Sequence, residues 1–173
     1  QNQHEGGISS PLIVHWPEGI KLKHGSITRQ PAHLIDFMAT FIELADADYP
    51  QKVGSRKIDP LEGKSLVPIF KGKQRRGHEF IYFHFGSDRA VRQRKWKLVS
   101  AKGGKWELYN IEDDRTELND LSEKFPRKVD RLSKKWFRIA KDKDRLNEKA
   151  LKPVKPEIKS LSFRKDTSHQ IVD

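Results

Sequence analysis

The chain has 173 residues, of which 34% are charged and 35% hydrophobic, with a mean hydropathy of −0.82. This composition is typical of a folded protein with a modest core. The sequence contains no run of about 18 apolar residues, the length that a membrane-spanning helix needs. Cysteine is absent, which excludes disulfides, thiolate zinc sites and a cysteine nucleophile within these residues.

The net charge of +11 is unevenly distributed along the chain. Residues 1–70 hold 7 Lys and Arg against 8 Asp and Glu, whereas residues 71–173 hold 28 against 16. Two interpretations of this basic surplus stay open. It can reflect solvated helix faces with a lysine-rich tail, or a surface that attracts a polyanionic partner.

The first half contains two apolar segments separated by loops. Gly6 and Gly7 form a turn before an apolar run at residues 12–14, which predicts a short strand buried on both faces. Such a strand needs a sheet that the chain does not evidently contain. An apolar stripe predicts a helix over residues 31–45, and a loop over 46–63 follows it. A short apolar turn spans residues 65–70, and a change in composition near residue 74 marks a domain boundary.

The second half has the pattern of a small sheet followed by one helix. We expect strands at residues 79–85 and 89–100, the latter with a bulge near Gln93 and Arg94. A glycine turn at 102–105 leads to a return strand at 106–109. A basic amphipathic helix is predicted over 126–141, and a loosely held tail over 142–173.

Few residues form a pattern that carries chemistry by itself. The seven histidines are dispersed, and no phosphate-binding glycine loop or serine nucleophile elbow occurs. His84 and Arg89 flank a Gly-Ser-Asp break between two strands, where Arg89 could bind an anionic group in bidentate fashion. The alternative is that His84 is an ordinary strand residue and that Arg89 pairs with Asp88 or another acid.

The basic half also interleaves aromatic residues with cations, as nucleic-acid surfaces do. However, Trp96 and Trp136 fall on predicted core stripes, and no RNA- or DNA-binding signature matches. The sequence therefore argues against nucleic acid as a partner.

Five stretches, in order, resemble the sulfatase family, the arylsulfatase-type, formylglycine-dependent hydrolases. The first, residues 5–17, is similar to the family's E-G-G-I/V-x-x-P-x-I-x-x-W-P segment. The next two, residues 36–40 and 61–66, are similar to its D-x-x-P-T helix, with Ala39 in place of the proline, and its D-G-x-S-L turn. The last two, residues 89–98 and 107–117, match its R-A-V-R-x-G-x-W-K-L and E-L-Y-D-L-x-x-D-P-x-E stretches.

The resemblance implies an α/β fold: the C-terminal fragment of an alkaline-phosphatase-like sulfatase. Residues 1–73 would close the large α/β domain. Residues 74–141 would form a small antiparallel sheet with one amphipathic helix, and residues 142–173 a basic tail. The resemblance also implies a sulfated small molecule or glycan as substrate, and a periplasmic or secreted location.

The resemblance implies that the reactive groups are not in this chain. The family's formylglycine, made in a C/S-x-P-x-R motif, and its calcium ligands would lie in a missing N-terminal sulfatase portion, so the chain binds neither cofactor and is expected to be inactive alone. His84, Arg89 and His4 are the expected substrate-binding residues at the rim of the cleft. An alternative is a basic module that binds a polyanion, either a sulfated polysaccharide or nucleic acid.

Overall fold

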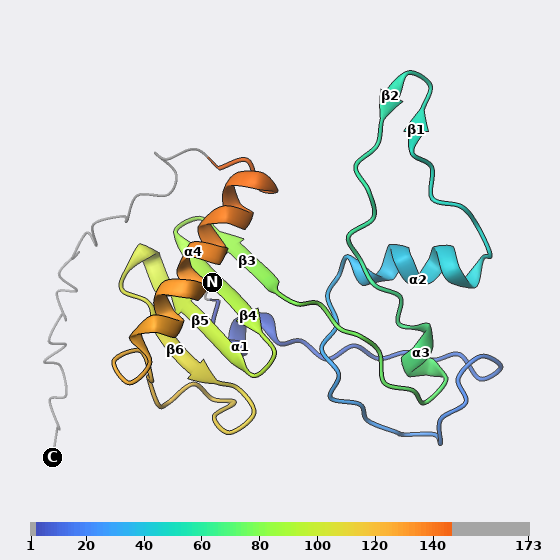
Figure 1. Cartoon of the computed structure of the whole chain (residues 1–173). Helices are drawn as coiled ribbons and strands as arrows, with labels where there is room; N and C mark the ends of the chain where they lie inside the picture. Colours follow the sequence, from blue (N-terminus) through green and yellow to red (C-terminus); the bar gives the residue numbers. More distant parts are fainter. Residues whose placement is uncertain (1–2, 147–173) are drawn as a thin grey trace, which may run out of the picture.

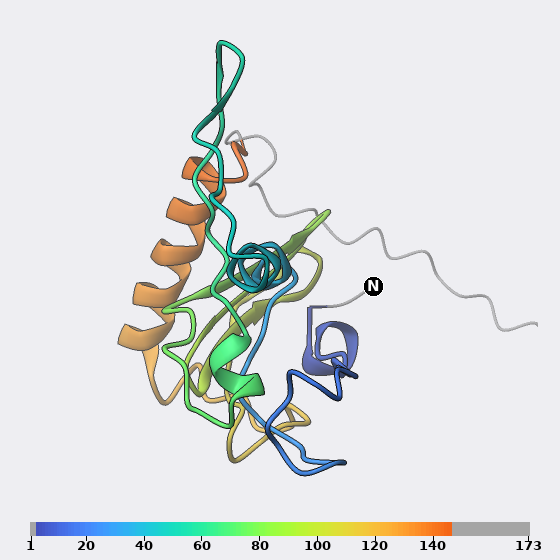
Figure 2. The same cartoon turned by 90° about the vertical axis from the view of Figure 1, so that its right-hand side faces the viewer.

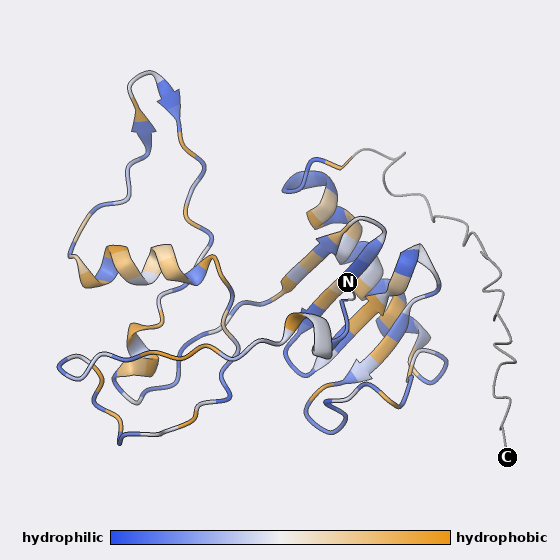
Figure 3. Ribbon diagram, turned by 180° about the vertical axis from the view of Figure 1, so that it is seen from behind, coloured by the Kyte–Doolittle hydropathy of each residue, from blue (hydrophilic) through white to orange (hydrophobic). Residues whose placement is uncertain are grey.

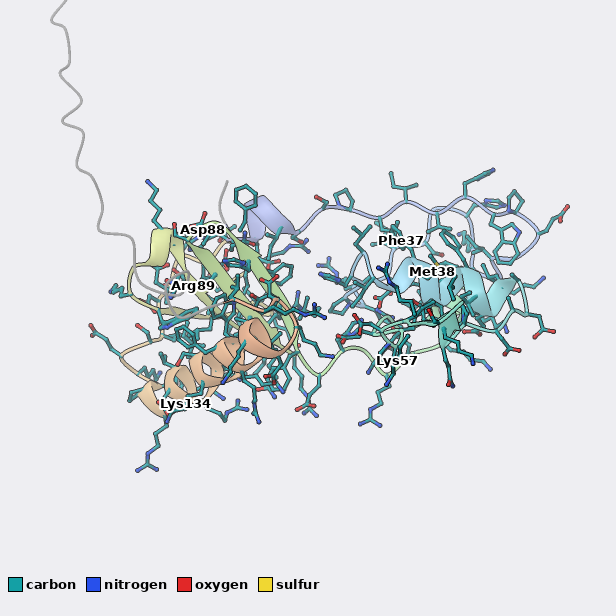
Figure 4. The ribbon with its side chains drawn as sticks, turned by 90° about the horizontal axis from the view of Figure 1, so that it is seen from above. Phe37, Met38, Lys57, Asp88, Arg89 and Lys134 are labelled. Atoms are coloured by element: carbon teal, nitrogen blue, oxygen red, sulfur yellow. The ribbon has the colours of Figure 1, made fainter. Side chains whose placement is uncertain are left out.

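The computed structural model describes residues 3–146, which form two lobes joined by extended segments (Figure 1; Figure 4). One lobe contains a four-stranded antiparallel sheet, and the other contains a helix, a one-turn helix and a two-stranded hairpin. Most of the predicted tail lies outside the described residues. Among the described residues, no helix is long and apolar enough to cross a membrane.

The sheet is a meander in which each strand pairs with the next along the chain. Its strands are β3 (Ile81–Phe85), β4 (Asp88–Gln93), β5 (Trp96–Ser100) and β6 (Glu107–Asn110). The short 3-10 helix η1 (Ala101–Gly103) connects the last two. The predicted strands at both ends of this meander are confirmed.

The predicted bulge near residues 93 and 94 is wrong, because the chain reverses there. Gln93 pairs with Trp96 across a two-residue turn, so the predicted strand 89–100 is the hairpin β4–β5. Arg94 in this turn has a positive φ of 53°. The change of phase in the apolar pattern therefore marks a turn.

Helix α4 (Pro126–Asp142) covers one face of the sheet, as predicted. Its buried residues Leu132, Trp136 and Ala140 pack against Val91, Leu98 and Leu108 in one core cluster. The Trp136 indole N–H donates to the carbonyl of Phe83 at 3.0 Å, which satisfies the one polar group of this large side chain.

The opposite face of the sheet is covered as well. It carries a second buried cluster of Ala90, Val99, Tyr109 and Ile111. Helix α1 (Glu5–Ile8) lies on this face, so that the sheet separates α1 from α4 (Figure 2). The N-terminal residues therefore pack on the C-terminal sheet, although the sequence groups them with the large domain.

The second lobe contains α2 (Asp36–Leu44), the hairpin strands β1 (Lys52–Val53) and β2 (Arg56–Lys57), and α3 (Val67–Phe70). The expected loop over 46–63 thus contains a small hairpin, and the apolar turn over 65–70 contains a one-turn helix.

The expectation of a buried strand at residues 12–14 is wrong. These residues form no strand, and Ile13 is 88% exposed. The described residues offer no sheet edge that pairs with them.

The apolar stripe of α2 also faces outward. Buried on this helix are Asp36 and Thr40, both polar. The ribbon of α2 is largely coloured hydrophobic in Figure 3, and five large apolar side chains on and beside it are exposed: Leu34, Ile35, Met38, Phe41 and Leu44. The helix begins at Asp36, whereas the sequence places Pro31 in its first turn.

Candidate functional site

A buried ionic cluster joins α1 to the sheet. The Lys97 ammonium lies 2.9 Å from Glu5 Oε1 and 3.0 Å from Glu117 Oε1, and the Lys97 side chain is completely buried. The backbone N–H of Glu5 also donates to Glu117 Oε2 at 2.5 Å. Two carboxylates and one ammonium held out of water depend on one another, since a single buried charge without its partner is costly.

His4 lies beside this cluster and contacts β6. Its Nε2 is 3.1 Å from Glu107 Oε2, and its ring packs edge-on against Tyr109 with centroids 6.0 Å apart. The Tyr109 hydroxyl donates to the same Glu107 oxygen at 3.0 Å. Burial, and then this hydrogen bond, raise the pKa of Tyr109 well above its usual range, so Tyr109 is a neutral hydrogen-bond donor here.

A second polar cluster joins α2 to the segment that leads into the sheet. Asp36, whose side chain is fully buried, contacts Arg75 Nη2 at 2.9 Å and His78 Nε2 at 2.6 Å. The backbone N–H groups of His33 and Lys64 donate to its two carboxylate oxygens. Burial alone would raise the pKa of Asp36, but these four hydrogen bonds outweigh it and hold the pKa at about 2.

Both ring nitrogens of His84 are engaged within the chain. Nδ1 is 2.9 Å from the carboxylate of Asp144, just beyond α4, and Nε2 is 2.8 Å from the carbonyl oxygen of Gly86. The Tyr82 hydroxyl donates to the same Asp144 oxygen at 2.8 Å. His84 therefore ties the β3–β4 turn to the residues that follow α4.

Arg89 is only 5% exposed. Its guanidinium carbon lies 5.3 Å from the ring centre of Trp136 and 5.7 Å from that of Phe137, which are cation–π contacts. Burial lowers the pKa of this guanidinium. Arg89 is also the register partner of His84, so the two side chains share the α4 face of the sheet.

The structure brings together two of the three predicted substrate-binding residues. His84 and Arg89 lie between the sheet and α4, whereas His4 lies on the α1 face. Register places His84 and Arg89 near the end of the sheet formed by the β3–β4 turn and η1, and the contact with Glu107 places His4 near the same end. Their substrate-binding role stays a prediction.

Residues 3–146 contain no group of three or more histidine and acidic side chains arranged to hold a metal. In both clusters the buried carboxylates are already paired with basic side chains, Glu5 and Glu117 with Lys97 and Asp36 with Arg75 and His78. A calcium ion does not fit a site whose carboxylates are paired with fixed cations, and we assign no step of chemistry to a metal in this part of the chain.

Residues 2–142 match the family model "N-sulphoglucosamine sulphohydrolase, C-terminal". The chain belongs to this family. This sulfatase domain is 39% identical over 85 residues to the steryl-sulfatase of Mus musculus, an alignment that covers 49% of the chain and 12% of that protein. It is 34% identical over 106 residues to arylsulfatase D of Homo sapiens, covering 61% of the chain and 16% of the relative.

A sulfatase of Schizosaccharomyces pombe is 30% identical over 140 residues, which are 77% of the chain and 25% of that protein. The chain therefore spans a quarter or less of each of these relatives. Among solved structures, the crystal structure titled Ps i-CgsB superposes with a TM-score of 0.54 at 23% identity, covering 72% of the chain and 27% of the other. This similarity supports the fold.

The two clusters give a structural role to four side chains of the sulfatase-like stretches. Glu5, Lys97 and Glu117 come from three different stretches and meet in one buried cluster. Asp36 comes from a fourth stretch and binds the backbone of Lys64 in the fifth. The stretches that pointed to the family thus contain residues whose buried contacts connect segments distant in the sequence. We call these two clusters, Glu5–Lys97–Glu117 and Asp36 with its partners, the joints.

Sequence reasoning did not identify these joints. The strand pattern places Lys97 among polar positions, but the second face of the sheet is covered by α1, and Lys97 is buried there. One signal was available for Asp36, because Asp36 and Thr40 lie four residues apart on the polar side of a helix with an unusually apolar stripe. That side packs inward here, where the Thr40 hydroxyl accepts a bond from the N–H of Leu66.

Proposed function

We propose that this chain is the C-terminal domain of a sulfate-ester hydrolase whose reactive groups lie in a preceding part of the same protein. The family match supports the reaction class, the hydrolysis of sulfate esters. The resemblance to that family implies that the nucleophile is a formylglycine and the Lewis acid a calcium ion. Both would be held by the preceding part of the protein and not by this chain. The location proposed by analogy is periplasmic or secreted.

The exposed apolar face of α2 is the observation that carries this proposal. Met38 is 53% exposed and Phe41 is 61% exposed, and the extended segment near Ile13 exposes apolar side chains in the same lobe. A free-standing domain seldom leaves such a face in water. The alignments cover only 12% and 25% of two of the relatives, which leaves room for a preceding α/β portion in this protein. Such a portion would bury this face.

The residues of this chain would then position the wall of the cleft and leave bond breaking to the other portion. The Glu5–Lys97–Glu117 cluster fixes α1 against the sheet, so that His4 is held at the edge of β6. An imidazole N–H and a guanidinium are donors that favour a sulfate oxyanion. His4 is the candidate for this contact, with His84 and Arg89 as the candidates on the other face.

A free-standing polyanion-binding module is the other proposal, and the same apolar face argues against it. Such a module would need to bury the hydrophobic side of α2 within itself, and in the described residues that side is open.

The experiment compares two proteins in a hydrolysis assay with an aryl sulfate and calcium. We expect turnover from the protein expressed from its complete gene and none above a heat-denatured control from the 173-residue chain. Turnover by the 173 residues alone would show that they hold their own nucleophile. A complete gene product that hydrolyses no sulfate ester, with its formylglycine verified by mass spectrometry, would overturn the reaction class.

A further inference from the structure

The outer face of α4 carries a continuous row of cations. Along the helix and the turn before it, positive side chains recur at alternating spacings of four and three residues, which places them on one side of a helix. The row consists of Lys124, Lys128, Arg131, Lys135 and Arg138. At 1.5 Å per residue it is about 20 Å long, with a charge about every 5 Å.

The β4–β5 turn extends this row sideways. Arg131 Nη2 donates to the side chain of Gln93 at 2.7 Å, and the Lys128 ammonium lies 4.4 Å from the ring centre of Trp96, so the turn and the helix are in contact. The turn adds Lys95, whose ammonium lies 5.9 Å from the ring centre of the same Trp96. A shallow hollow lined by Lys124, Lys128 and Arg131 lies at the start of the helix.

Within residues 3–146, the five cations of the row form no ion pair with a carboxylate. Helix α4 also carries a solvent-exposed ion pair between Lys134 and Asp130. A row of like charges at neighbouring positions repels itself, and an external polyanion would relieve that repulsion.

We propose that this row, Lys124 to Arg138 with the β4–β5 turn, binds a polysulfated glycan chain at a position separate from the ester being hydrolysed. This inference rests on the proposed function, because a sulfate-ester hydrolase meets its substrate as part of a larger sulfated molecule. The row faces away from the sheet side that carries α1 and His4 (Figure 2). None of the five cations is among the three candidate substrate contacts His4, His84 and Arg89, so in this proposal the row holds a part of the glycan other than the ester being hydrolysed.

Single-stranded nucleic acid fits this surface less well. Proteins that bind single strands stack bases on open aromatic faces. Here the aromatic rings beside the row are occupied, since Lys128 lies over Trp96 and the Lys135 ammonium lies 4.4 Å from the ring centre of Phe80. In the part of the chain that the structure describes, the surface along the row therefore offers cations and no open aromatic ring. This suits a sulfated glycan, which has negative charges and no aromatic bases to stack.

The test measures binding of a fluorescent heparin oligosaccharide to the protein expressed from its complete gene, at about 50 to about 200 mM salt. The row variant is Lys124→Gln/Arg131→Gln/Arg138→Gln, three exposed side chains. The matched control removes the same three charges from the β1–β2 hairpin, Lys52→Gln/Arg56→Gln/Lys57→Gln, which is also exposed. Figure 4 shows Lys57 and Lys134 in different lobes.

We expect the row variant to bind heparin about tenfold or more weakly, with a salt dependence shallower by about two to three counterions, and the control to bind within about twofold of the parent. Both should hydrolyse a small aryl sulfate at the parent rate. Equal weakening in both variants, or DNA bound more tightly than heparin through the same residues, would overturn this inference. If the unmutated protein from the complete gene does not hydrolyse the aryl sulfate at all, that result would instead contradict the proposed function.

Discussion

Replacing Lys97 by methionine removes the one cation from a cluster that holds two buried carboxylates. Glu5 is 8% exposed and Glu117 is 2% exposed at the side chain, so neither carboxylate can be rehydrated without displacing α1. Breaking a buried ion pair from one side costs about 3–5 kcal/mol. Because methionine fills most of the volume of lysine, we attribute this cost to the carboxylates of Glu5 and Glu117, which are left buried without a cation.

The assay is urea unfolding followed by tryptophan fluorescence, to which Trp96, Trp106 and Trp136 in the sheet lobe contribute. The matched control is Lys105→Met, because Lys105 is 74% exposed and its ammonium lies 3.8 Å from Asp120. An exposed pair of this kind contributes about 0–1 kcal/mol. Equal effects of Lys97→Met and Lys105→Met would refute the reasoning.

A rescue experiment separates charge from packing. If stranded carboxylates cause the loss, then adding Glu5→Gln and Glu117→Gln to Lys97→Met should restore part of the stability, since neutral amides are cheaper to bury than charges. A triple variant less stable than Lys97→Met would show that packing dominates.

Three further predictions concern the joints and turns. The depressed pKa of Asp36 stabilises the fold fully above pH 4, and this contribution of about 2 kcal/mol is lost as the pH falls through 2; a pH series of unfolding midpoints should show this loss in the parent and not in Asp36→Asn. A Cβ at Gly63 would lie 2.0 Å from a backbone carbonyl of the α2 N-terminus, so Gly63→Ala should lower the free energy of unfolding by about 1–3 kcal/mol, whereas Gly77→Ala, which meets open space, should change it by less than about 0.5. Arg94 has a positive φ, so Arg94→Gly should stabilise by about 0.5–1 kcal/mol while Lys95→Gly destabilises; thermal melts in which both glycines act alike would contradict the backbone argument.

The sequence predicts the elements whose contacts are local or periodic. Helix α4 was predictable because its apolar residues recur on one side and its cations on the other, and the structure buries Leu132 and Trp136 accordingly. The strands β3 and β6 were predictable from their composition and turns.

The predictions that the structure contradicts are those that depend on which part of the protein covers a given surface. Periodicity identifies α2 as a helix, but it cannot tell whether the apolar stripe is covered within the chain, and Phe41 is exposed. Residues 12–14 have the composition of a buried strand and meet no partner strand among the described residues. Lys97 has the pattern of a polar strand position and is buried because Glu5, 92 residues earlier, pairs with it.

For the candidate site, the sequence proposed three residues and could not place them in space. His84 and Arg89 are close because the β3–β4 turn makes them register partners, which their flanking of a glycine break suggested. His4 is on the opposite face, since α1 packs where no local pattern indicated that it would.

The central claim is that a preceding portion of the protein covers the apolar face of α2. The most direct measurement is the urea midpoint of Phe41→Lys in the protein expressed from its complete gene, compared with Val53→Lys; in this structure the two parent side chains are 61% and 64% exposed. Our account predicts that Phe41→Lys lowers the free energy of unfolding by about 3 kcal/mol or more, because a lysine would be buried without a partner, while Val53→Lys changes it by less than about 0.5. Equal, near-zero effects at both positions would contradict the claim.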